Sequence, residues 1–128
     1  MARQSIDVDS LVHQNPIPAA SRIGPLIESS IIPPSNPGVR DRPEDVDQQI
    51  TNLFLHMGNI LEAAGATWDD VVKVTFFVTD RDSARTALNG PWLDKFPDPA
   101  SRPARHTLEI AGDGKPAISC LFTAYVGG

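Results

Sequence analysis

Apolar and polar residues recur along this chain with two different periods, which predict helices and strands. From residue 43 to residue 64, apolar side chains recur every three or four positions, as on one buried helical face. They are Val46, Ile50, Leu53, Phe54, Met57, Ile60, Leu61 and Ala64. Pro43 suits the first turn of this helix, and Gly65 suits a C-terminal stop. We therefore predict one long amphipathic helix in this part of the chain.

A central strand and a second helix are expected next. Residues 69–78 are rich in β-branched and aromatic side chains, which favour a strand. Alternation along this strand predicts one face that carries Val72, Val74, Phe76 and Val78. Residues 81–96 have apolar side chains at helical spacing, and Gly90-Pro91 is expected to bend or interrupt that helix.

The remaining pattern predicts a mixed sheet. Two late strands are expected at residues 105–110 and 118–126, joined by the turn-forming residues 112–114. Two earlier strands are expected near residues 17–23 and 26–31. The order β-β-α-β-α-β-β predicts an α+β fold with helices on one face of a mixed sheet.

The last expected strand has two different faces. One face is apolar and suited to packing under helices; it holds Ile118, Cys120, Phe122, Ala124 and Val126. The other face is too mixed for a core and too apolar for open solvent; it holds Ser119, Leu121, Thr123 and Tyr125. A half-apolar sheet face commonly contacts another subunit, so we expect an oligomer.

Length and composition restrict the possible protein classes. A chain of 128 residues predicts one domain, which we assign to residues 15–128, after a partly mobile segment at residues 1–14. No apolar run is long enough for a membrane-spanning helix, and the first residues do not resemble a secretory signal. Cys120 is the only cysteine, so we expect no disulfide and a reduced, cytoplasmic protein.

Charge and histidine spacing argue against two kinds of site. The net charge is −5 and the arginines are scattered, which disfavours nucleic acid as the main partner. His13, His56 and His106 are far apart, so we expect no metal site; we expect His56 at the surface or its boundary. Cys120 is interpreted as a small buried hydrophobic residue rather than a nucleophile.

Arg105 has an unusual position in the pattern. It begins a late strand, directly after the turn at residues 103–104. If Leu108 and Ile110 pack into the core, Arg105 lies on the opposite face, where a neighbouring subunit is expected. A guanidinium there pairs across an interface or binds a carboxylate ligand with two hydrogen bonds, and spacing alone does not separate these alternatives.

Four segments together form a recognisable pattern: residues 61–75 (LEAAGATWDDVVKVT), residues 102–105 (RPAR), residues 29–33 (SSIIP) and Leu88-Asn89. They resemble the Rid family (RidA/YjgF, reactive intermediate imine deaminases). The first segment is similar to the signature segment of that family, the second to its strand entry, and the other two to further family segments. The resemblance extends from about residue 15 to residue 126, nearly the whole chain.

This resemblance implies a fold, an assembly and a reaction. It implies a trimer with a chorismate-mutase-like α+β fold and clefts between subunits. It also implies that enamine or imine products of other enzymes are hydrolysed to 2-oxo acids and ammonia, without a metal or cofactor. Arg105 would hold the substrate carboxylate, and Ser30 and Asn89 match pocket positions. Trp92 is expected to contact substrate as well.

Four positions depart from the family pattern. The pocket tyrosine of the family falls on Ile17, and the glycine after the pocket serine is Ile31. The residue two after the arginine, often cysteine in the family, is Thr107. An acidic residue of the last strand is replaced by Ser119, whose hydroxyl is too weakly basic at neutral pH to replace a carboxylate as general base.

Three functions therefore remain open at this stage. The first is an imine or enamine deaminase of a divergent subgroup, with Arg105 and Ser119 as its catalytic candidates. The second is a trimer that binds small carboxylates, such as 2-oxo acids, without catalysis. The third is ribonuclease or translation-inhibitor activity, which the acidic composition supports least.

Overall fold

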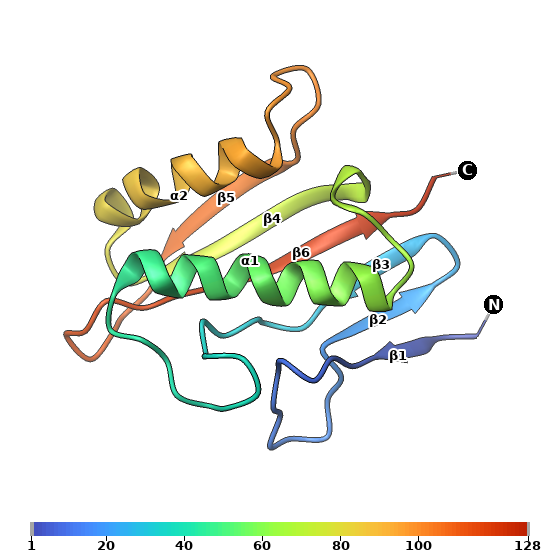
Figure 1. The fold of residues 1–128 in the computed structure, drawn as a ribbon, viewed down its shortest axis with the longest axis horizontal. Helices are drawn as coiled ribbons and strands as arrows, with labels where there is room; N and C mark the ends of the chain where they lie inside the picture. The colour runs from blue at the N-terminus through green and yellow to red at the C-terminus, as the bar shows by residue number, and fades with distance from the viewer. Residues whose placement is uncertain (1, 128) are drawn as a thin grey trace.

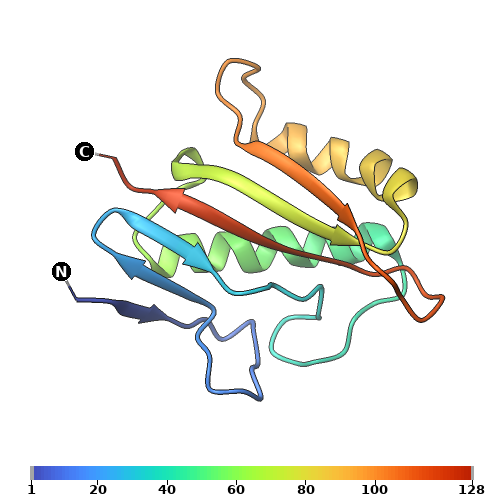
Figure 2. The same cartoon turned by 180° about the vertical axis from the view of Figure 1, so that it is seen from behind.

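The computed structural model describes residues 2–127, which form a six-stranded sheet with two helices on one face (Figure 1). The elements are β1 (Gln4–Ile6), β2 (Ala20–Ile23), β3 (Leu26–Ser29), α1 (Val46–Ala63), a 3₁₀ turn (Trp68–Asp70), β4 (Val71–Val78), α2 (Arg81–Lys95), β5 (Ala104–Glu109) and β6 (Ile118–Tyr125). The strand order is β1-β2-β3-β6-β4-β5, and β4 and β5 run parallel while the other neighbours are antiparallel. The view from behind shows a sheet face without helices (Figure 2). The expected α+β fold is confirmed.

No helix within residues 2–127 is both long and apolar enough to cross a membrane.

The first helix, α1, agrees with the apolar pattern but begins later than predicted. Its N-cap is Asp45, whose carboxylate accepts a hydrogen bond from the Gln48 amide, so Pro43 lies before the helix rather than in its first turn. At the other end Gly65 has a φ of 77°, and the Ala66 amide donates to the Leu61 carbonyl at 2.8 Å. This is the usual glycine-terminated helix end, as predicted.

The second helix, α2, is continuous through Pro91, so of the expected bend or interruption at Gly90-Pro91 no interruption occurs. Proline at position 91 removes one hydrogen-bond donor. The helix remains intact because Leu88, Trp92 and the C-cap residue Phe96 are buried on its inner side. Asp80 is the N-cap and accepts hydrogen bonds from the Asp82 and Ser83 amides.

The central strand, β4, presents a different residue to the core at its start than the alternation predicts. The strand register shifts between Val71 and Lys73, which marks a bulge. The bulge turns Val71 inward and leaves Val72 53% exposed, so the expectation that Val72 shares a face with Val74, Phe76 and Val78 is wrong. Beyond the bulge, Val74, Phe76 and Val78 share one face, as predicted, and this face is buried.

The N-terminal part of the chain joins the sheet, which the sequence did not predict. Residues 4–6 form β1 and pair with β2, and the side chains of Ile6 and Leu11 are buried in the core. Three residues are too few to show a clear period. Whether residues 1–14 are partly mobile stays a prediction.

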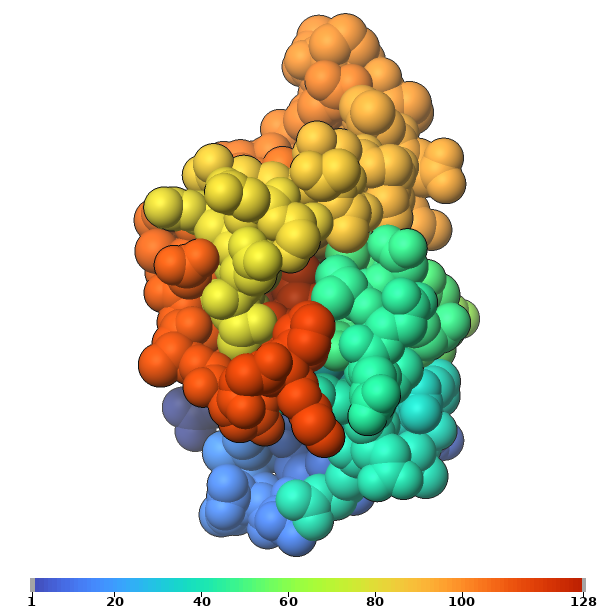
Figure 3. All heavy atoms as spheres, turned by 90° about the vertical axis from the view of Figure 1, so that its left-hand side faces the viewer, coloured from blue at the N-terminus to red at the C-terminus, as the bar shows by residue number. Residues whose placement is uncertain are grey.

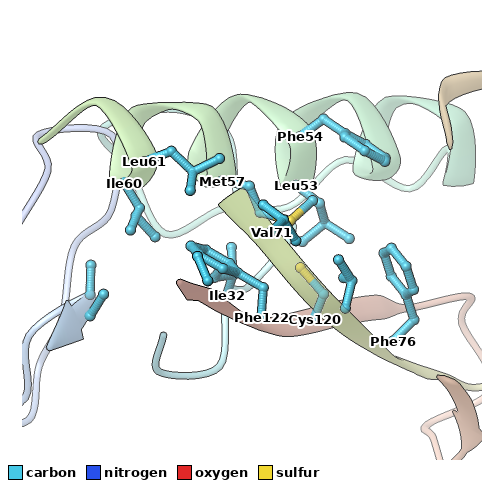
Figure 4. Packing of buried hydrophobic residues seen from close by; sticks show 14 of the residues in the cluster. Ile32, Leu53, Phe54, Met57, Ile60, Leu61, Val71, Phe76, Cys120 and Phe122 are labelled. Atoms are coloured by element: carbon cyan, nitrogen blue, oxygen red, sulfur yellow. The ribbon is translucent and has the colours of Figure 1, made fainter. Parts of the chain in front are cut away.

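The core lies between the sheet and α1. Ile118, Cys120, Phe122 and Ala124 of β6 are buried, while the residues between them are half-buried, which confirms the predicted two-faced strand. Figure 4 shows Cys120 and Phe122 beneath Leu53, Met57 and Leu61 of the helix.

A group of aromatic rings fixes α2 against the rest of the fold. The Trp92 and Phe96 ring centroids lie 4.7 Å apart, and Phe96 lies 5.9 Å from Trp68. Trp68 in turn lies 5.8 Å from Phe54 of α1, and Trp92 lies 6.3 Å from Phe76 of β4. Such pairs add directional packing to the burial of apolar area, so they hold α2 against α1 and β4.

Candidate functional site

Arg105 of β5 contacts two side chains of α2. Its Nη2 donates a hydrogen bond to Oδ1 of Asn89 at 3.0 Å, and its guanidinium carbon lies 5.2 Å from the centroid of the Trp92 ring. Asn89 and Trp92 are three positions apart, so both project from the same side of the helix. We call Arg105, Asn89 and Trp92 the arginine cluster. The structure thus brings together three of the residues that the sequence analysis selected.

The guanidinium of Arg105 has no acidic partner in the part of the chain that the structure describes. The ion pair found within residues 2–127 joins Arg42 to Asp113, at 3.9 Å. Burial, followed by the positive charge of Arg85, lowers the pKa of Arg105 from its ordinary value. Arginine stays protonated in proteins despite such shifts, so the cluster carries an uncompensated positive charge that suits a carboxylate.

The structure corrects the face on which Arg105 lies. Leu108 is 39% exposed and Ile110 is 45% exposed, so neither packs into the core. Arg105 pairs in register with the buried Val74 of β4 and therefore lies on the face that carries the helices. The predicted face is wrong because β5 is an edge strand whose helix-side positions are polar and whose apolar residues face outward.

Thr107 and Glu109 follow Arg105 on the same face of β5. Thr107 is half-buried and pairs in register with Phe76. Oε1 of Glu109 accepts a hydrogen bond from the backbone amide of Arg81 at 3.1 Å. The Glu109 carboxylate therefore stabilises the N-terminus of α2.

Ser119 and Ile31 lie at a second place, on the sheet face without helices. Ser119 pairs with Phe77 of β4 and lies between the buried residues Ile118 and Cys120, so its side chain is on the opposite face from theirs. Both line a cavity of about 360 Å³, together with His13, Pro33, Pro34, Arg42, Phe77, Ile110, Ala117 and Ile118. We call this the open-face cavity. Within one chain, Ser119 and Arg105 therefore lie on opposite faces of the sheet.

Ser30 directly precedes Ile31 of the open-face cavity, and Ile17 lines grooves that share His13 with that cavity. The Ser30 hydroxyl donates to the Pro18 carbonyl at 2.7 Å, so its proton is engaged within the chain. Ile17 is exposed and lines a groove with His13 and Asn15. Nε2 of His13 is buried and has no hydrogen-bond partner among residues 2–127. No sequence pattern associates His13 with Ile17 and Ile31, because only the tertiary fold brings them together.

His56 is fully buried, so its expected place at the surface or boundary is wrong. Its Nε2 donates to the Ser35 carbonyl at 2.8 Å, and its Nδ1 lies 3.0 Å from the Ser10 hydroxyl. Ser10 also accepts a hydrogen bond from Asn59. Burial lowers the pKa of His56, which the hydrogen bond to Ser35 partly offsets. This group ties residues 10 and 35 to α1 and is structural.

Two other candidate features are structural as well. Cys120 is fully buried and burial raises the pKa of its thiol, in agreement with its interpretation as a small hydrophobic residue.

In the loop after β5, a Cβ at position 112 would lie 2.6 Å from the Thr79 side chain, so Gly112 permits close packing there. Figure 3 shows this loop, in orange-red, beside the start of α2 and the start of α1. Within residues 2–127, no group of three potential metal ligands occurs.

Comparisons with known proteins identify the family of this chain. Residues 18–115 match the family model described as Endoribonuclease L-PSP. The chain belongs to the Rid family. A solved structure described as the yjgF gene product of Escherichia coli has a TM-score of 0.81, is 26% identical and aligns over 95% of this chain and 98% of its own.

Two curated relatives of this Rid protein have names that refer to imine chemistry. The 2-iminobutanoate/2-iminopropanoate deaminase of Escherichia coli is 34% identical over 70% of this chain and 70% of its own length. Reactive Intermediate Deaminase A, chloroplastic, of Arabidopsis thaliana is 35% identical over 62% of this chain. Three curated relatives, the Arabidopsis protein among them, are matched over only 43% to 59% of their own length.

Proposed function

We propose that this protein hydrolyses imine or enamine intermediates to 2-oxo acids and ammonia, with Arg105 as the anchor for the substrate carboxylate. The observation that supports this most is the uncompensated guanidinium of Arg105, oriented by Asn89 and Trp92. A planar guanidinium binds a carboxylate through two parallel hydrogen bonds, which fixes both the position and the orientation of the ligand.

The reaction needs no redox step. Water adds to the carbon of the C=N bond, and the nitrogen leaves as ammonia once it has gained protons. An enamine is first protonated on carbon to give the imine. The part of this chain is to hold the carboxylate so that the neighbouring imine carbon is presented to water in a fixed geometry. The proposal assigns no metal or cofactor to this site.

The proposal includes a homotrimer. The open sheet face carries Phe77, Leu108 and Leu121, which supports its burial against a second copy of the chain. In the proposed assembly Ser119, Ile17, Ile31 and Ser30 of one subunit would complete a cleft with the arginine cluster of another. This arrangement would reconcile the two separate groups of site residues. A cytoplasmic location is part of the same proposal.

An assay with freshly generated 2-iminobutanoate tests the function. An amino acid oxidase produces the imine, and semicarbazide competes with the protein for it. We expect the wild-type protein to reduce semicarbazone formation and to accelerate ammonia release. Arg105→Ala should lose about 10²-fold in kcat/KM, because a charged, two-point contact is removed. Arg102→Ala, at another arginine of the same segment, is the control. Equal activity of wild type and Arg105→Ala would refute the proposed anchor.

A second function, binding of 2-oxo acids without catalysis, is favoured by one observation. Asn89, Trp92 and Thr107 around Arg105 have no group that is basic at neutral pH, and Glu109 is engaged at the start of α2. Thermal stabilisation by a 2-oxo acid in the absence of any imine hydrolysis would support this alternative. We do not propose ribonuclease activity, because the chain is acidic and its arginines are scattered along the sequence.

A further inference from the structure

A second arginine lies next to the arginine cluster. Arg85 precedes Asn89 by one turn of α2, and Arg85, Asn89 and Trp92 share one helix face through their spacing of four and three residues. This face is turned toward Arg105, since Arg105 contacts both Asn89 and Trp92. In Figure 1, α2 runs alongside β5 at the edge of the sheet. Among the charged groups, Arg85 is the one whose positive charge acts on Arg105.

Nothing in the described chain neutralises these two arginines. Neither has a carboxylate within 4.0 Å among residues 2–127. Two acidic residues on the same strand and helix do not pair with these arginines: the Glu109 carboxylate accepts a hydrogen bond from the Arg81 amide, and Asp82, one turn before Arg85, forms no ion pair with it. Two like charges at a helix–strand edge repel each other, and a ligand with two negative groups would relieve that repulsion.

We propose that the site prefers substrates with two carboxylates, namely the imines or enamines of dicarboxylic 2-amino acids. Arg105 binds the carboxylate next to the imine carbon, and Arg85 binds the distal one. The reacting bonds are unchanged: water adds at the C=N carbon, ammonia leaves, and the distal carboxylate takes no part. This inference rests on the proposed function, and Arg85 acts in it as a determinant of specificity.

Binding of two product analogues to the full-length protein tests the inference. 2-Oxopentanedioate and 2-oxopentanoate have the same carbon skeleton and differ in the distal carboxylate. Titration calorimetry should give about fivefold tighter binding of the dicarboxylate, as expected for a partly exposed ion pair. Arg85→Gln should abolish this difference while changing the affinity for 2-oxopentanoate less than about twofold. Arg81→Gln, which removes the same charge one turn farther away, should leave the preference intact.

The outcomes separate the two proposals. Equal affinity of the wild-type protein for both acids, or a preference that persists in Arg85→Gln, would overturn the role of Arg85 and leave the anchor at Arg105 in place. If neither acid binds, the proposed function fails together with the inference. A dicarboxylate preference that disappears in Arg85→Gln and in Arg81→Gln alike would indicate general charge attraction and would also overturn it.

Discussion

The side chain of Arg105 is oriented by its neighbours, but none of these neighbours neutralises its positive charge. Asn89 accepts a hydrogen bond from one of the five N–H groups of Arg105, and the Trp92 ring lies beside the guanidinium. The remaining N–H groups are available to a ligand. The sequence identified this residue because it follows a turn and begins a strand. The sequence did not predict the correct face of the strand. In this edge strand the apolar Leu108 faces outward and the polar residues face the helices, whereas apolar residues usually face the core.

His56 is the residue whose titration should couple most strongly to folding. Burial lowers its pKa in the folded protein, while in the unfolded chain it titrates near 6.5. Below this pH the unfolded state therefore binds more protons than the folded state. The contribution of neutral His56 to the free energy of unfolding is complete above about pH 7 and falls as the pH decreases, with a slope of at most about 1.4 kcal/mol per pH unit.

We expect the melting temperature of the wild-type protein to fall between pH 7 and pH 5. The part of this decrease that comes from protonation of His56 should be absent in His56→Gln. His106→Gln, at an exposed position, is the control and should retain the wild-type dependence. Scanning calorimetry at several pH values measures this. An identical pH dependence in wild type and His56→Gln would contradict the role of the buried imidazole.

At the scale of elements, the long α1 helix and the two-faced β6 strand could be predicted because their periods extend over many residues. The three-residue strand β1 could not, since it is too short to show a period. The bulge in β4 could not be predicted either, because Val71 and Val72 are equally apolar and only pairing with β6 selects the one that faces inward. Likewise, the burial of Trp92 and Phe96 kept α2 intact despite Pro91.

The end of α1 provides a test at this scale. Gly65 adopts a φ of 77°, and a Cβ there would lie 3.4 Å from Nη1 of Arg22. This guanidinium also donates to the Ala64 carbonyl and so ties the helix end to β2. Gly65→Ala should lower the free energy of unfolding by about 1–2 kcal/mol, because left-handed backbone is unfavourable for alanine.

Gly65→Asn is the matched control for that prediction. Asparagine tolerates the left-handed region better than alanine and should therefore cost less. Urea denaturation gives both values. A Gly65→Ala variant as stable as the wild type, or less destabilised than Gly65→Asn, would contradict the assignment of backbone strain to this position.

At the scale of the whole molecule, the two groups of site residues lie on opposite faces of one sheet. Arg105 lies on the helix face, whereas Ser119 lies on the open face with Phe77. The family resemblance predicted both groups as parts of one site, but sequence spacing alone could not show that a single chain separates them. Assembly of several chains is the means by which they would meet.

The proposed trimer can be tested through Leu108, which is exposed on the open face in the single chain. Light scattering should give the mass of three chains for the wild type and of one chain for Leu108→Glu, because three buried carboxylates would oppose assembly. Leu55→Glu, at an exposed position on α1, should remain trimeric. A monomeric wild type at micromolar concentration would contradict the predicted assembly.

The central claim is that Arg105 accelerates imine hydrolysis by holding a carboxylate. The most direct measurement compares 2-iminobutanoate with an imine of similar size that lacks the carboxylate, each relative to its own spontaneous hydrolysis. We predict that the wild-type protein accelerates only the carboxylate-bearing imine and that Arg105→Ala reduces this acceleration by about 10²-fold. Equal acceleration of the two imines by the wild-type protein would contradict the claim.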